Sequence, residues 1–256
     1  WFIVAELRNP APLLQIRLLA ERNFGISMAV LTLFAIGMLG GTYLLPLYMQ
    51  RGLGYTALAA GSMFLPVGVI QGVLSAVSGY LTRYVRPLLL SAAGILIMAL
   101  SFWLASRFTL HTTHGHILFI LYLRGFGMGL TFAPLNLFSL KNLTQQDMAA
   151  AAGISNSIKQ LAGSIGIALL TVIFSARTSY HAAHETVSAA QTYVEGVTDA
   201  LRVVAVITLA ALLPLLGVFR KKRPGKSGVK GAATPSPGEA VSGKTDKTTI
   251  YRTKPE

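Results

Sequence analysis

Two basic residues, Arg124 and Lys159, lie inside long apolar stretches of the sequence. Arg124 follows His116 by eight residues, about 12 Å of helix, and Lys159 follows Ala149 by ten, about 15 Å. A charge at that depth in a bilayer costs roughly 2.5–3.5 kcal/mol on insertion scales, so it should face a cavity, a partner or water. The pattern indicates cations that line a polar pathway. The alternative is that each side chain snorkels to a headgroup.

Polar neighbours accompany both cations. At helical spacing, Ser155 and Lys159 share one face and Asn156 lies beside it. Asn136 lies further along the apolar stretch that contains Arg124. Polar residues on one side of a membrane helix can line a cavity. The predicted pathway residues are Gln71, Arg124, Asn136, Ser155, Asn156, Lys159 and Gln160.

Other chemistries find little support in the sequence. No nucleophile–base set, phosphate-binding glycine loop or zinc motif is evident, so we expect no enzyme activity and no cofactor. Histidines gather at residues 111–116 and 181–184, but loop histidines are usually solvated, and we expect no metal site. All nine Asp and Glu residues lie outside the apolar stretches. A proton-carrying carboxylate within the membrane would therefore have to come from outside this segment.

The elements that must position these residues are six apolar stretches, each long enough to cross a hydrocarbon core of about 30 Å as a helix. They are apolar on nearly every side, unlike the amphipathic helices of soluble proteins. The mean hydropathy of +0.58 agrees. The sequence predicts an all-α membrane protein with spans at residues 24–48, 56–81, 87–105, 116–139, 149–175 and 200–219.

The basic residues are unevenly distributed between the two sides of this bundle. The net charge of +13 is concentrated after residue 219, where ten Lys and Arg face three acidic residues, so nucleic acid is not an expected partner. Residues 1–23, 82–86, Lys141 and the tail bring sixteen basic residues to one side, against three or four on the other. Cytoplasmic loops carry the excess of Lys and Arg, so we expect both ends in the cytoplasm.

The chain divides into three segments. Residues 1–23 mix charges and prolines and suggest a cytoplasmic connector that follows an earlier span. Residues 24–219 form the predicted bundle, whose longest connection, residues 178–199, is polar and open to either a loop or a helix. Residues 220–256 are basic and too polar to bury a core, so a disordered tail is expected. The alternative is that the basic residues of this tail bind anionic lipid.

Small residues and prolines recur within the spans. Small residues let membrane helices approach closely, and prolines remove backbone hydrogen bonds and mark kinks or hinges. The predicted packing or hinge residues are Pro46, Pro66, Gly68, Gly72, Gly125, Gly129, Pro134, Gly163 and Gly166.

Three stretches of the sequence resemble a known family. Residues 24–66, with Leu45-Pro46-Leu47 and Leu65-Pro66, are similar to the ninth and tenth helices of the 14-helix drug:proton antiporters (EmrB/QacA group) of the major facilitator superfamily. Residues 124–135 resemble the twelfth helix and residues 152–166 the thirteenth, where that family often has Arg at the position of Lys159. Residues 79–87 resemble a degenerate copy of its cytoplasmic loop motif that lacks the Asp.

This resemblance, which covers residues 1–219, implies the C-terminal half of a proton-coupled multidrug exporter in a bacterial inner membrane. The fold would be two inverted three-helix repeats, and the partners would be the N-terminal half, the lipid bilayer, amphipathic substrates and protons. A periplasmic adaptor protein is a further candidate partner. Two alternatives remain open: a narrow exporter of a metabolite, siderophore or lipid-like molecule, and a scaffold bundle that does not transport.

Overall fold

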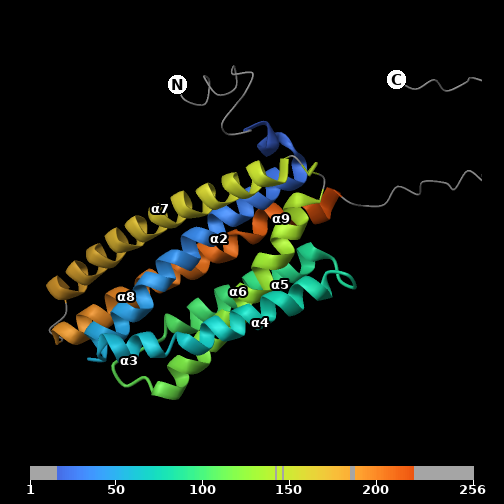
Figure 1. Ribbon diagram of the computed structural model, residues 1–256. Coiled ribbons are helices and arrows are strands. Elements are labelled where there is room, and N and C mark those ends of the chain that lie inside the picture. The colour runs from blue at the N-terminus through green and yellow to red at the C-terminus, as the bar shows by residue number, and fades with distance from the viewer. Residues whose placement is uncertain (1–15, 142, 146, 185–187, 222–256) are drawn as a thin grey trace, which may run out of the picture. The chain divides into compact units, whose positions relative to one another are not determined.

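The computed structural model describes residues 16–141, 143–145, 147–184 and 188–221 (Figure 1). The predicted tail after residue 221 and most of the predicted N-terminal connector lie outside these residues. The described part consists of helices joined by short turns and contains no strand. Its elements are η1 (Ile16–Ala20), α2 (Arg22–Leu47), the π-helical turn η2 (Tyr48–Gly52), α3 (Ala57–Ser62), α4 (Leu65–Leu81), α5 (Pro87–Ala105), α6 (His114–Leu140), α7 (Asp147–His184), α8 (Ala189–Ala210) and α9 (Leu212–Lys221).

Six of the helical segments in the described ranges are long and apolar enough to cross a membrane. They are α2 with η2, α3 with α4, α5, α6, α7, and α8 with α9. The prediction of an all-α protein with six candidate spans is thereby confirmed.

The contacts between spans follow an internal symmetry that Figure 1 lets the reader trace. Helix α2 packs on α7 and α8, while α6 packs on α4 and α5. If the first three spans (α2, α4 and α5) are exchanged in order with the last three (α6, α7 and α8), the α2–α7 pair becomes the α6–α4 pair. The α2–α8 pair becomes the α6–α5 pair in the same way. The α2–α6 and α5–α8 pairs map onto themselves. The α7–α8 contact is the exception, because its counterpart, the α4–α5 pair, makes no comparable contact. The other pairs are arranged as expected of two three-helix repeats.

The polar segment at residues 178–199 is mostly helix. Helix α7 continues to His184 and α8 already begins at Ala189, with Ser188 as its N-cap residue. Both helices therefore extend beyond the apolar stretches from which the spans were predicted. Hydropathy locates the part of a helix that suits lipid, whereas backbone hydrogen bonding decides where the helix ends.

Close contact between α5 and α6 depends on a pair of glycines that the sequence analysis did not select. A Cβ added to Gly127 would lie 2.8 Å from the Met98 amide nitrogen and 2.9 Å from the Gly94 carbonyl oxygen. A Cβ added to Gly94 would lie 2.8 Å from the Gly127 carbonyl oxygen. These are backbone atoms, which cannot move aside without separating the helices.

We expect Gly127→Ala to destabilise the bundle by about 1–3 kcal/mol, because the added methyl group overpacks a backbone contact. The matched control is Gly72→Ala on α4, where nothing lies within 4 Å of the added Cβ. That change should be neutral or slightly stabilising, since alanine is the better helix former. Thermal unfolding in detergent would compare the two variants, and equal melting temperatures would contradict the proposed contact.

Candidate functional site

Lys159 opens into a cavity of about 360 Å³ between α2, α6 and α7. Helix α7 supplies Ser155, Asn156 and Lys159, which lie within about one turn of each other. Helix α6 supplies Asn136 and Ser139. The remaining lining residues are apolar: Leu31, Phe132, Leu140 and Ala152. The cavity thus combines a half-buried ammonium group and amide and hydroxyl groups with an apolar wall.

Local hydrogen bonds hold the polar walls of the cavity. The Ser155 hydroxyl donates to the Ala151 carbonyl oxygen at 2.7 Å and lies 3.5 Å from Met28 Sδ of α2. The Ser139 hydroxyl donates to the Asn136 carbonyl oxygen at 2.8 Å. Because these hydroxyl groups bond within their own helices, the Asn and Lys side chains are the polar groups best able to meet a guest molecule.

Arg124 lies elsewhere, buried in the bundle with 2% of its surface exposed. Its Nη2 donates to the Met38 carbonyl oxygen at 3.1 Å and to the Thr42 hydroxyl of α2. Its guanidinium carbon lies 5.4 Å from the centre of the Phe102 ring of α5, a cation–π distance. Nε and Nη1 are buried and have no hydrogen-bond partner among the described residues. Arg124 therefore connects α2, α5 and α6 and does not line the cavity of Lys159.

The structure brings together four of the seven predicted pathway residues, namely Asn136, Ser155, Asn156 and Lys159. Gln160 is exposed on α7, and Gln71 is half-buried on α4; neither lines this cavity. Membership of a transport pathway stays a prediction for all seven. Ser139 was missed, although its spacing of three residues from Asn136 places it on the same face of α6.

The predicted packing glycines fall into two groups. Gly125 and Gly129 face α4, and a Cβ on Gly166 would lie 2.6 Å from the Ile36 carbonyl oxygen of α2. Gly163 faces the Leu39 side chain. In contrast, Gly68 and Gly72 have nothing within 4 Å, so any close contact there would have to come from outside the described part of the chain.

The predicted hinge prolines all lie within helices. Pro46 is the second-last residue of α2, directly before the π-helical turn η2. Pro66 falls in the first turn of α4, where its missing N–H costs no hydrogen bond. Pro134 lies inside α6, two residues from both Phe132 and Asn136 of the cavity wall.

Comparison with known proteins places the chain among transporters. The Major Facilitator Superfamily model matches residues 3–167. The chain is 31% identical over 180 residues to the uncharacterized MFS-type transporter YhcA of Bacillus subtilis, covering 70% of this chain and 34% of that protein. It is 29% identical over 181 residues to the fatty acid resistance protein FarB of Neisseria gonorrhoeae, covering 71% of this chain and 36% of FarB. It is 32% identical over 189 residues to the multidrug export protein EmrB of Escherichia coli, covering 73% of this chain and 37% of EmrB.

The chain therefore spans about a third of the length of these relatives. They confirm the resemblance to the EmrB group, and a superfamily of transporters agrees with the expectation that the chain is not an enzyme. This chain, whose described part contains six membrane-length helices, belongs to the major facilitator superfamily.

Proposed function

We propose that this chain is the C-terminal half of a proton-coupled exporter of amphipathic small molecules that works by alternating access. The cavity around Lys159 is the observation that carries the proposal. It is formed by α2 and α7 of opposite repeats together with α6, and it joins a cation and amide groups to an apolar wall. Such a site suits a molecule with an apolar body and one polar end.

The charge of the cavity favours an anionic or hydrogen-bond-accepting end group. Among the described residues, Lys159 is the only charged one that lines it, and none of the lining residues is acidic. A cationic substrate would need a carboxylate contributed by the rest of the transporter. The names of two relatives fit both possibilities, since FarB is named for fatty acid resistance and EmrB for multidrug export.

The exposed faces of α4 and α7 are the proposed docking surface for the N-terminal half. Only 17% of the apolar window of the span containing α4, and 22% of that of α7, is buried, against 61% for the first span. Each face carries large apolar residues at four-residue spacing. They are Val69, Val73 and Val77 on α4, and Leu161, Ile165 and Leu169 on α7. The two helices occupy equivalent positions in the two repeats, as an interface between two such bundles requires.

We propose that the membrane is a bacterial inner membrane and that both ends of the bundle are cytoplasmic. Because the chain has no cysteine, single cysteines can be introduced at the exposed positions Tyr84, Thr113 and Ala190 without background labelling. A membrane-impermeant thiol reagent applied from outside should label positions 113 and 190 and spare position 84. Outside labelling at 84, with none at 113 or 190, would reverse the orientation.

The function is tested in proteoliposomes. A complete transporter containing this chain should export a fluorescent amphipathic compound when a proton gradient is applied, and an uncoupler should stop the export. The chain alone should insert but not transport, because alternating access needs a second bundle. Uncoupler-sensitive efflux by the chain alone would overturn the half-transporter assignment. A complete protein that moves no amphipathic compound would favour the scaffold alternative.

A further inference from the structure

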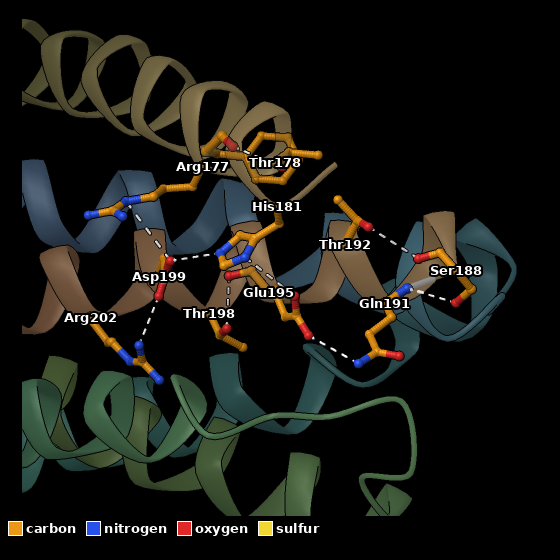
Figure 2. Close-up of polar contacts among 11 residues, drawn as sticks. Arg177, Thr178, His181, Ser188, Gln191, Thr192, Glu195, Thr198, Asp199 and Arg202 are labelled. Atoms are coloured by element: carbon orange, nitrogen blue, oxygen red, sulfur yellow. Dashed lines mark hydrogen bonds and ion pairs between the residues drawn. The ribbon is translucent and has the colours of Figure 1, made fainter. Parts of the chain in front are cut away.

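The end of the bundle opposite α9 carries a cluster of ionisable side chains between α7 and α8. Figure 2 shows His181 of α7 between two carboxylates of α8, Glu195 and Asp199. His181 Nε2 lies 3.2 Å from Asp199 Oδ2, and Nδ1 lies 3.5 Å from Glu195 Oε2. The side chain of His181 is 16% exposed and that of Asp199 is 18% exposed, so solvent reaches these contacts poorly.

The number of protons decides whether both contacts are favourable. A carboxylate only accepts hydrogen bonds, and a neutral imidazole has one N–H and one lone pair. With neutral His181 and two ionised carboxylates, one ring nitrogen would direct its lone pair at a carboxylate oxygen. One added proton removes this conflict, either as an imidazolium that donates from both nitrogens or as a protonated carboxyl group. Glu195 Oε2 is buried and makes no hydrogen bond among the described residues, so it stands to gain most.

The other charged groups around the cluster moderate this effect. Arg202 Nη1 lies 2.8 Å from Asp199 Oδ1, and Arg177 Nε lies 3.9 Å from Asp199 Oδ2. Both arginine side chains are more than half exposed, at 57% and 56%, so water screens much of their charge. Both contact Asp199. Besides His181, the Glu195 carboxylate accepts a hydrogen bond from the neutral Gln191 amide, at 3.1 Å.

Further titratable groups of the described residues lie around the cluster. Tyr180 of α7 presents its ring at 5.7 Å from the imidazole. His111, from the α5–α6 connection, lines a pocket of about 190 Å³ together with Glu195. The charge of Arg51 in η2 acts on Tyr193, two residues before Glu195. None of these groups supplies an N–H to Glu195 Oε2 among the described residues.

We propose that His181, Glu195 and Asp199 form a proton-binding site that joins the ends of α7 and α8. The proton-bound site holds the two helices together through both ring nitrogens. Loss of the proton leaves one nitrogen facing a carboxylate and loosens the pair. The stabilisation is therefore present at acid pH and is lost as the pH rises through the site's titration. If the proposed topology holds, the site faces the outside of the cell, but the proposal does not depend on transport.

A metal ion is a poorer occupant of this site than a proton. The two ring nitrogens point to opposite sides of the imidazole, so Glu195 and Asp199 cannot share one ion through the same nitrogen. No group of three or more metal-binding side chains with suitable geometry occurs within the described ranges.

The test is titration of the histidine rings in the intact chain. The chain would be labelled with ¹⁵N-histidine and placed in lipid nanodiscs, and His181→Gln would assign its ring resonances. We expect Glu195→Gln to make His181 lose its second proton at a proton concentration at least tenfold higher than in the parental chain. The matched change Asp147→Asn at the opposite end of α7 should leave the titration of His181 unchanged. A titration of His181 that Glu195→Gln does not shift, or that Asp147→Asn shifts equally, would overturn the proposal.

A distance measurement tests the proposed closure independently. Spin labels at the exposed positions Ala183 and Ala190 would report the separation of α7 and α8 near the cluster. We expect the distance distribution to widen as the pH rises through the titration of His181, and Glu195→Gln to abolish that dependence. A distribution that stays unchanged over this pH range would show that the proton does not hold the helices together.

Discussion

Lys159→Met in the complete transporter should lower the rate of export at least tenfold while the protein still inserts and folds. Within the described part of the chain, Lys159 is the only charged residue that lines the cavity between α2, α6 and α7, and methionine has nearly its length without its charge. The uncharged cavity would keep its apolar wall but lose the group that holds a polar end. A tenfold loss corresponds to about 1.4 kcal/mol, within the range of one charged hydrogen bond. Lys159→Arg keeps the charge and should retain most of the activity.

The measurement is proton-driven efflux from proteoliposomes, with the protein content of each preparation determined separately. Lys141→Met is the matched control, because Lys141 is an exposed lysine at the end of α6 that lies outside the cavity. It should export at the parental rate. If Lys159→Met does so too, Lys159 does not belong to the pathway.

Arg124→Met should raise the melting temperature of the bundle and yet impair export. The guanidinium group has two buried nitrogens without a partner among the described residues, and an unsatisfied buried donor costs about 1–3 kcal/mol. Removal of the guanidinium group leaves neither of its acceptors on α2 without a hydrogen bond, because the Thr42 hydroxyl still donates to the Met38 carbonyl oxygen at 2.6 Å. A methionine sulfur can also replace the contact with Phe102. We expect a net gain of about 1 kcal/mol, or about 2–4 °C.

The expected loss of export follows from the same two buried nitrogens of Arg124, Nε and Nη1, which have no hydrogen-bond partner among the described residues. A buried cation with unused N–H groups suits a partner that arrives during the transport cycle, such as a carboxylate of the other half. Arg107→Met is the control, because Arg107 is exposed in the α5–α6 connection. Thermal unfolding and efflux would be measured on the same preparations. A lower melting temperature would indicate that Arg124 is structural, and unchanged efflux would remove it from the predicted pathway.

Hydropathy and charge were enough to predict the six spans, because a lipid environment admits so few backbone arrangements. They also identified the face of α7 that carries Ser155, Asn156 and Lys159. They could not separate Lys159 from Arg124, since both are cations in apolar segments. Lys159 lies in a cavity, whereas Arg124 donates a hydrogen bond to the neighbouring helix α2. This difference depends on where α2 and α5 lie, which the sequence does not show.

The Gly94–Gly127 contact and the His181 cluster could not be predicted from the sequence, for different physical reasons. Gly94 and Gly127 look no different in the sequence from Gly68 and Gly72, because a helix that is apolar on every side does not reveal which face meets a neighbour. The cluster at His181 depends on two helices extending past their apolar segments, where polar residues had left the choice between loop and helix open.

The length of α7 has a mechanical consequence. Its 38 residues span about 57 Å, nearly twice the hydrocarbon thickness, and no proline interrupts them. His181 and Lys159 lie on this one rod, about 33 Å apart. A rigid tilt of about 5° would displace one end by about 5 Å relative to the other. Helix α7 can therefore act as a lever, so that a small rearrangement near His181 alters the width of the cavity around Lys159 without any relay of side chains between the two places.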